Sequence, residues 1–225
     1  MMLTLPEKLL LLGLHDQKGT IVTSASTALM YGLAGAVLLE LTFYDKLDLH
    51  KKKVIVKDPS TTGDELLDQV LLHIHESTKQ RTPKYWVMTI GNKLNIKNRL
   101  LDRLIEKEIL RKVEDKILWV FSRNLYPPSN PLPEQELRKR IKEAVFQDGE
   151  REERIVALLS LIKACNLINE VFEPDERKAA KKRIKAISSE ETYGKAVSQI
   201  VSEINTSIIV ATTTAAAVSS SSSSN

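Results

Sequence analysis

Apolar residues recur every three to four positions along most of the chain, which is the spacing of one face of an α-helix. The pattern predicts helices over about 65–75 and 96–108, and Pro133 opens another that continues to Val145. Ile155–Leu167 is almost continuously apolar and predicts a central helix. In the first two helices the spacing is carried by Leu66, Leu67, Val70, Leu71, Ile74, Ile96, Leu100, Leu101, Leu104 and Ile105.

A second pattern is the run from Gly19 to Leu39, which contains no charged side chain. Its length matches the roughly 20 apolar residues that a membrane-spanning helix needs. Its first half is rich in Thr and Ser, however, and only Leu29–Leu41 is densely apolar. A helix that is apolar on all sides also occurs at the centre of a soluble core, and small residues such as Gly32 and Gly35 let neighbouring helices approach. We therefore predict a central core helix over Leu29–Leu41 in preference to a membrane span.

Three sequence signals mark helix starts. In a capping box, a Ser or Thr side chain accepts a hydrogen bond from an amide of the first turn, and a Glu three positions later bonds back to the cap. Thr4–Glu7, Thr62–Glu65 and Ser188–Glu191 have this spacing. They predict helices that begin just after each cap.

Strand patterns are few. Ile117–Phe121 is the strongest, with Leu110–Val113 as its partner and residues 114–116 as the turn, which predicts a β-hairpin. A shorter pair is predicted at Leu47–Leu49 and Val54–Val56. The expected fold class is therefore mainly α, with a central helical bundle surrounded by amphipathic helices and a protruding β-hairpin.

The composition is that of an ordinary soluble protein, with 42% apolar and 28% charged residues in a chain of 225. We expect one domain over residues 1–218 and a disordered serine-rich tail over 219–225. The first residues lack the basic segment of a signal peptide, and the single cysteine, Cys165, suits a reducing compartment. These features favour a cytoplasmic protein.

The formal net charge of +4 is too small to indicate a nucleic-acid binder. Its distribution is more informative, because Lys51–Lys53 form one basic cluster and a predicted helix over 175–187 carries another on one face. A solvated surface accounts for both clusters. The alternative for the helix is contact with anionic lipid, to which each basic residue adds about 1 kcal/mol. We call this set the basic face: Arg177, Lys178, Lys181, Lys182 and Lys185.

Residue types that support catalysis or metal binding are sparse. His73 and His75 lie two positions apart in a predicted helix, so their imidazoles point to opposite sides and do not share one ion. Cys165 lies in an apolar helix, where a buried structural thiol is the usual case. The sequence has no glycine-rich phosphate loop, nucleophile elbow or His-Glu-x-x-His motif. We expect no catalytic residue, no metal and no cofactor.

One alternative function follows from the order of the elements. The helices at 65–75 and 96–108, followed by a hairpin at 110–121, have the order of a winged helix, whose second helix enters the DNA major groove. Acidic residues nearly balance the basic ones on that second helix, which weakens attraction to a polyanion. We therefore predict no nucleic-acid partner. The opposing residues are Lys97, Arg99 and Arg103 against Asp102, Glu106 and Glu108.

Five segments resemble the Golgi phosphoprotein 3 family in sequence and in order. They are Leu3–Gly19, Gly32–Leu41, Thr62–Asp68, Leu104–Leu110 and Leu158–Ala164, and the likeness extends over about residues 3–210. Each segment alone is a common leucine-rich pattern, but the five in this order are specific together. The resemblance implies a mostly helical domain without enzymatic activity and with a protruding hairpin at about 112–126.

The resemblance also implies a peripheral membrane protein on the cytosolic face of a membrane, which is the Golgi in eukaryotes. Family members bind phosphatidylinositol 4-phosphate and hold glycosyltransferases through their cytosolic tails. The family hairpin is associated with oligomerisation and membrane contact, which implies a homo-oligomer and makes Leu125 and Tyr126 candidate contact residues. The competing hypothesis is a soluble protein-interaction domain that has kept the fold and lost the lipid site.

The headgroup pocket of the family is only partly present in this sequence. Its tryptophan and the arginine of its Gly-Leu-Arg-Gly motif correspond to Ala25 and Ala34, and two later arginines correspond to Leu94 and Lys97. Lys97 keeps the positive charge, although lysine lacks the bidentate fork of arginine. Lys93 lies four residues earlier, on the same helical face. We predict that Lys93 and Lys97 bind an anion together; the alternative is that both are ordinary solvated lysines.

Overall fold

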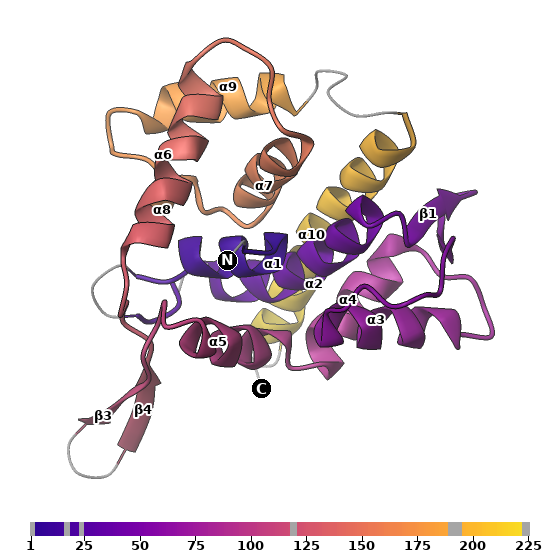
Figure 1. Cartoon of the computed structure of the whole chain (residues 1–225), viewed down its shortest axis with the longest axis horizontal. Helices are drawn as coiled ribbons and strands as arrows, with labels where there is room; N and C mark the ends of the chain where they lie inside the picture. Colours follow the sequence, from indigo (N-terminus) through magenta and orange to yellow (C-terminus); the bar gives the residue numbers. More distant parts are fainter. Residues whose placement is uncertain (1–2, 16–18, 23–24, 118–120, 189–194, 222–225) are drawn as a thin grey trace.

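The apolar helix α2 (Ser26–Phe43) lies at the centre of the protein. We describe it from a computed structural model, in which the described residues are 3–15, 19–22, 25–117, 121–188 and 195–221. Fourteen of the 18 residues of α2 are buried. The prediction of a central core helix is therefore confirmed. The helices packed most extensively on α2 are α1 (Leu5–Leu12), α4 (Pro83–Lys93), α7 (Glu153–Ala164) and α10 (Lys195–Ser221) (Figure 1).

The other described elements complete a mainly α-helical fold, as predicted. One hairpin projects from the body at the bottom of Figure 1, beside α5, whereas α9 lies at the top. The second hairpin lies at the right-hand edge. The bounds of these elements are β1 (Leu47–His50), β2 (Lys53–Val56), α3 (Glu65–His75), α5 (Ile96–Glu106), β3 (Val113–Ile117), β4 (Phe121–Leu125), α6 (Leu132–Phe146), α8 (Ile168–Val171) and α9 (Arg177–Ile187).

By length and composition alone, two helices in the described ranges are suited to crossing a membrane. In the first, Ser26–Phe43, 78% of the residues are buried inside the protein, which is the environment of a core helix. In the second, Gln199–Ala217, 33% are buried. Burial of α2 thus gives a complete account of its apolar sequence without a bilayer.

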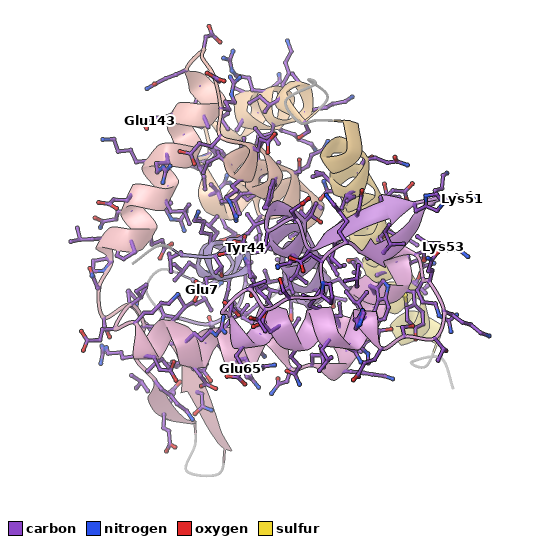
Figure 2. The ribbon with its side chains drawn as sticks, turned by 45° about the vertical axis from the view of Figure 1, so that its right-hand side comes forward. Glu7, Tyr44, Lys51, Lys53, Glu65 and Glu143 are labelled. Atoms are coloured by element: carbon purple, nitrogen blue, oxygen red, sulfur yellow. The ribbon has the colours of Figure 1, made fainter. Side chains whose placement is uncertain are left out.

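The predicted short strand pair is confirmed as β1 and β2. Leu47 pairs with Val56 and Leu49 with Val54, in antiparallel register. Lys51 and Lys52 form the turn with φ values of 49° and 60°, the left-handed conformation that a two-residue hairpin turn requires. The Lys51–Lys53 cluster therefore lies at an exposed tip, and Figure 2 shows Lys51 and Lys53 at the edge of the molecule.

The predicted strand boundaries of the larger hairpin are wrong. β3 spans Val113–Ile117 and β4 spans Phe121–Leu125, so the charged residues 114–116 lie within a strand and do not form the turn. A ribbon of two strands that projects from the body buries neither face fully, so polar residues are tolerated along it. The bounds of about 112–126 that the family resemblance implies agree with the observed strands.

The three predicted capping boxes have different outcomes. At Thr4, both hydrogen bonds of the box are present, and the Glu7 carboxylate accepts from the Thr4 amide at 2.8 Å. The capping box predicted at Thr62 is wrong. The Asp64 carboxylate caps α3 by accepting hydrogen bonds from the amides of Leu66 and Leu67, and the Thr62 hydroxyl donates to the Asp68 carboxylate instead. The third box, Ser188–Glu191, extends outside the described residues.

Two segments differ from the sequence-based expectation. Helix α4 was not predicted, although Thr82 accepts a hydrogen bond from the Tyr85 amide and Pro83 follows it, as at many helix starts. Its mixed composition hides the apolar stripe formed by Trp86, Val87 and Ile90. At the other end of the chain, α10 continues to Ser221, so helical backbone enters the predicted serine-rich tail, and residues 222–225 lie outside the described ones.

Two buried carboxylates connect the helices around α2. Glu40 of α2 is 2% exposed; it accepts a hydrogen bond from the Leu5 amide of α1 at 3.0 Å and pairs with Arg154 of α7. Glu7 of α1 is fully buried and pairs with Lys107, which follows α5. Buried charges need such partners, because desolvation of an unpaired carboxylate is costly. These contacts connect α1 to α2 and to the end of α5, and they connect α2 to α7.

Candidate functional site

A cavity of about 650 Å³ lies at the base of the β3–β4 hairpin, and we call it the polar cavity. Three segments that are distant in sequence form it: the loop before α2, the first two turns of α5, and the inner ends of the hairpin. Most of its lining side chains are polar or charged, among them Ser26, Asn95, Lys97, Asn98, Asp102, Lys112, Asn124 and Tyr126.

A second cavity of about 380 Å³ adjoins it beside α2 and the α4–α5 turn, and we call it the apolar cavity. The two cavities share the lining residues Ile21, Ser26, Asn95 and Lys97, and therefore lie next to each other. Several aliphatic side chains line the second cavity. The last residue of α4 and the second residue of α5 each contribute a lysine. Its lining includes Leu29, Met30, Leu33, Lys93, Ile96 and Lys97.

Two helix N-termini meet at these cavities. α2 begins at Ser26 and α5 at Ile96, and both residues line the apolar cavity. The first four amides of a helix have no acceptor within the helix, and the residues before these starts, Ala25 and Asn95, make no side-chain cap. The amides of the first helical turn and the positive end of the helix dipole attract anions. The wall shared by the two cavities therefore has the electrostatic character of an anion site.

Lys93 and Lys97 both line the apolar cavity, and Lys97 also lines the polar one. The reasoning that placed them on one helical face is wrong, because Lys93 ends α4 and Lys97 is the second residue of α5. Between them the chain turns at Asn95, whose φ is 47°. Both lysines are exposed, and neither makes an ion pair within the described residues. Their charges are therefore available to a ligand.

The alanines at the family's pocket positions do not take part in either cavity. Ala25 and Ala34 are fully buried, and neither they nor half-buried Leu94 line the two cavities. A methyl group is too short to reach the surface from these positions. Of the residues that line the polar cavity, only Lys97 and Tyr126 were predicted from the sequence. The residues that were missed include four polar ones at or near element boundaries, where no periodic pattern marks them: Ser26, Asn95, Lys112 and Asn124.

Arg103 fixes the orientation of α5 relative to α3. Its guanidinium donates two hydrogen bonds to the Asp64 carboxylate, at 2.7 and 2.8 Å. Burial acts to raise the pKa of Asp64, but the hydrogen bonds from Arg103 and from the amides of α3 outweigh it, so the pKa lies below its usual range. The paired carboxylate therefore stays ionised at neutral pH and holds the helix that presents Lys97.

Gly19 joins the hairpin to the loop that borders the polar cavity. Its carbonyl accepts a hydrogen bond from the Tyr126 amide at 3.0 Å, and its φ is +58°, in the left-handed region. A Cβ atom at this position would lie 2.0 Å from the Tyr126 carbonyl carbon. Only glycine permits so close an approach of the two backbones.

Replacing Gly19 with alanine is expected to lower the free energy of unfolding by about 2 kcal/mol or more, because left-handed strain and a backbone clash act together. Urea unfolding followed by circular dichroism measures the change. Gly63→Ala is the matched control, since Gly63 also has positive φ, +82°, but has nothing within 4 Å of a Cβ. Equal losses in the two variants would show that the contact with Tyr126 does not matter.

Leu125 and Tyr126 lie at the base of the hairpin and not at its tip. Both are half-buried; Leu125 pairs with Val113, and Tyr126 packs against the core and lines the polar cavity. Their predicted contact with a membrane or a second copy stays a prediction. Residues 118–120, which join the two strands, lie outside the described residues.

The basic face lies on α9, at the opposite end of the molecule from the β3–β4 hairpin in both views (Figures 1 and 2). Its four lysines are exposed, whereas Arg177 donates hydrogen bonds to the carbonyl groups of Phe172 and Asn169. Arg177 therefore secures α8 against α9. The apolar positions Ala180, Ile184 and Ile187 are buried, as the helical spacing predicts.

The described residues contain no group of three or more His, Cys, Asp and Glu side chains placed to hold a metal ion. His73 and His75 are both exposed, and His73 contacts the edge of Trp86 with ring centroids 5.7 Å apart. Cys165 is fully buried, and burial raises the pKa of its thiol to about 12. A thiol with so high a pKa is not a nucleophile at neutral pH.

Comparison with known proteins agrees with the family resemblance seen in the sequence. A model of the Golgi phosphoprotein 3 (GPP34) family matches residues 5–204. Vacuolar protein sorting-associated protein 74 from Schizosaccharomyces pombe is 32% identical over 164 residues, which cover 64% of this chain and 47% of that protein. The match thus spans about half the length of that relative. On the family match, which covers most of the chain, this protein belongs to the Golgi phosphoprotein 3 family.

Proposed function

We propose that this protein is a peripheral membrane protein that binds an anionic phospholipid, phosphatidylinositol 4-phosphate by family, and acts as a non-enzymatic adaptor that retains membrane proteins. The observation that carries the proposal is the group of positively charged side chains and helix N-termini at the wall shared by the two cavities. Lys93, Lys97 and the N-termini of α2 and α5 come together there. Lysines and free helix amides are the groups that bind phosphate in many proteins.

The position of the hairpin supports a definite orientation on the membrane. β3 and β4 project from the body next to the polar cavity, and the chain between Ile117 and Phe121 is apolar, with Leu118, Trp119 and Val120. An apolar tip that enters the interface would bring the cavity to the level of the headgroups. In this orientation α9 faces away from the membrane, so its lysines are not part of the contact we propose.

The adaptor role and the cellular location rest on family membership. The proposal places the protein on the cytosolic face of the Golgi in a eukaryotic cell, with the cytosolic tails of membrane proteins as partners. The homo-oligomer formed through the hairpin belongs to the same proposal. Sedimentation velocity with and without vesicles tests that part separately.

Replacing Lys93 and Lys97 together with alanine is expected to weaken vesicle binding about 30-fold. Each lysine near an anionic surface contributes about 1 kcal/mol, and 1.4 kcal/mol corresponds to a tenfold change in affinity. The measurement is co-sedimentation with phosphatidylcholine vesicles that contain phosphatidylinositol 4-phosphate, phosphatidylserine or neither. Both side chains are exposed, so the fold should be unaffected.

Lys178→Ala with Lys182→Ala is the matched control, because it removes the same charge from exposed positions on α9. We expect this variant to bind as the wild type does. Equal loss in the two variants would mean that attraction is non-specific and would contradict the assigned site. If the wild type bound none of the three kinds of vesicle, the membrane function would be overturned. A soluble protein-interaction domain would then be favoured.

A further inference from the structure

Arg81, which lies between α3 and α4, has a side chain that stacks on an aromatic ring and has no hydrogen-bond acceptor. Its guanidinium carbon lies over the ring of Tyr85, 4.7 Å from the centroid. Within the described residues the Arg81 side chain makes no hydrogen bond or ion pair, and its Nε atom is buried without a partner. Tyr85 is 42% exposed, so the stacked pair lies at the surface. A guanidinium held in this way offers unused N–H donors to a ligand, and carboxylates match their geometry.

The tip of the β1–β2 hairpin lies beside Arg81. The Val54 amide donates a hydrogen bond to the Arg81 carbonyl group at 2.8 Å, and the two residues form an isolated β-bridge. Lys53 directly precedes Val54 and is exposed, as are Lys51 and Lys52. None of the three lysines makes an ion pair within the described residues. Two segments that α3 separates in the sequence therefore bring unpaired cations to one place.

Positive charge exceeds negative charge in these two segments. Residues 48–53 and 76–85 together carry six lysine and arginine side chains but only two carboxylates, those of Asp48 and Glu76. Cations that lie close together repel one another, and an acidic ligand would remove this repulsion. The charge of this region is therefore complementary to a ligand with several carboxylates.

The backbone of the hairpin tip shows that lysine is not the residue best suited to this turn. Lys51 and Lys52 have φ values of 49° and 60°, in the left-handed region. A residue with a Cβ atom is disfavoured there, and Asn-Gly is the usual sequence of such a two-residue turn. The chain therefore gives up stability to carry two charges at the tip. Strain of this kind is typical of functional positions.

We propose that Arg81, Tyr85 and Lys51–Lys53 form a docking surface for an acidic segment of a partner protein. The Arg81 guanidinium would bind one carboxylate in the bidentate mode, and the lysines would attract further carboxylates along the segment. The β1–β2 hairpin lies at the right-hand edge of Figure 1, away from the β3–β4 hairpin, and Figure 2 shows Lys51 and Lys53 at the periphery. The surface would thus stay accessible on the membrane-bound protein, so a protein fits it better than a lipid does. This inference goes beyond the proposed function, which assigns no contact to this edge.

Binding of a fluorescein-labelled octaglutamate peptide, measured by fluorescence anisotropy at low ionic strength, tests the proposal. We expect Arg81→Lys to bind the peptide about tenfold more weakly than the wild type does, because this variant keeps the charge but loses the bidentate geometry. Equal affinities of the two proteins would overturn the inference. So would a wild type that does not bind the peptide.

Lys51→Asn combined with Lys52→Gly separates binding from stability. We expect this variant to melt about 2–4 °C higher than the wild type, because Asn-Gly fits the left-handed turn. We also expect it to bind octaglutamate about tenfold more weakly. Weaker binding by a more stable protein cannot result from unfolding.

Lys178→Ala with Lys182→Ala is the matched control, because it removes the same charge from exposed positions on α9. We expect this control to bind octaglutamate as the wild type does. Equal weakening in the control and in the hairpin variant would mean that attraction is non-specific, and would overturn the inference. If the hairpin variant lost vesicle binding but kept its affinity for the peptide, the tip would contact lipid, which would also overturn it.

Discussion

Replacing Glu40 with alanine is expected to lower the free energy of unfolding by about 3–5 kcal/mol, the usual loss when one partner of a buried ion pair is removed. Glu40 is 2% exposed and bonds to both the Leu5 amide and the Arg154 guanidinium. Without it, the amide at the start of α1 loses its acceptor, and Arg154, which also stacks near Phe43, loses its counter-charge. Urea unfolding measured by circular dichroism gives the difference in free energy.

Two variants show which part of the loss comes from the buried network. Glu40→Gln keeps an acceptor for the Leu5 amide but removes the charge, so its loss should be intermediate. Glu143→Ala removes a partly exposed carboxylate that lies 3.9 Å from Lys139 on α6, and surface pairs of this kind contribute at most about 1 kcal/mol. If Glu40→Ala were no more destabilising than Glu143→Ala, the network would not hold α1 and α7 to α2.

The helices with a regular apolar stripe were predictable because each must bury one face against the core. α3, α5 and α9 are of this kind, and their buried positions match the spacing of the sequence. α4 was missed because its polar and apolar residues alternate irregularly. Its signal lies in the Thr82 cap and Pro83, which identify a start but carry no information about burial.

The β3–β4 hairpin was predictable in kind but not in register. Three consecutive charged residues, 114–116, resemble a turn, yet they lie in a strand whose two faces are not both covered. The apolar residues Leu118, Trp119 and Val120 follow β3 in the sequence, and they lie outside the described residues.

The candidate site was less accessible from sequence than the fold. Lys97 followed from the family resemblance, and Lys93 was included on the wrong geometric ground, because the helix breaks at Asn95. The cavities form where segments around residues 19–27, 91–102 and 112–126 lie together in space. A local sequence pattern carries no information about such long-range contacts. The amides at the starts of α2 and α5 have no side-chain signature at all.

Replacing Leu118 and Trp119 with serine is expected to weaken binding to vesicles containing phosphatidylinositol 4-phosphate about 100-fold. Burial of one large apolar side chain contributes roughly 1.5–3 kcal/mol, so loss of two amounts to about 3 kcal/mol at the lower bound. A difference of that size corresponds to about a hundredfold change in affinity. Co-sedimentation measures the affinity, and sedimentation velocity shows whether the variant has also lost an oligomer.

Tryptophan fluorescence separates insertion of the hairpin from a general effect on binding. The chain has two tryptophans, and Trp86 is 2% exposed, so its emission should not respond to lipid. The emission of Trp119 should shift to shorter wavelength when vesicles are added, and Trp119→Ser should abolish this shift. Tyr44 is 44% exposed and lies away from the β3–β4 hairpin (Figure 2), so Tyr44→Ser should bind vesicles as the wild type does. If the wild type bound vesicles fully but the emission of Trp119 did not shift, Trp119 would remain in water. Binding would then come from contact of the lysine-lined cavity with the headgroups.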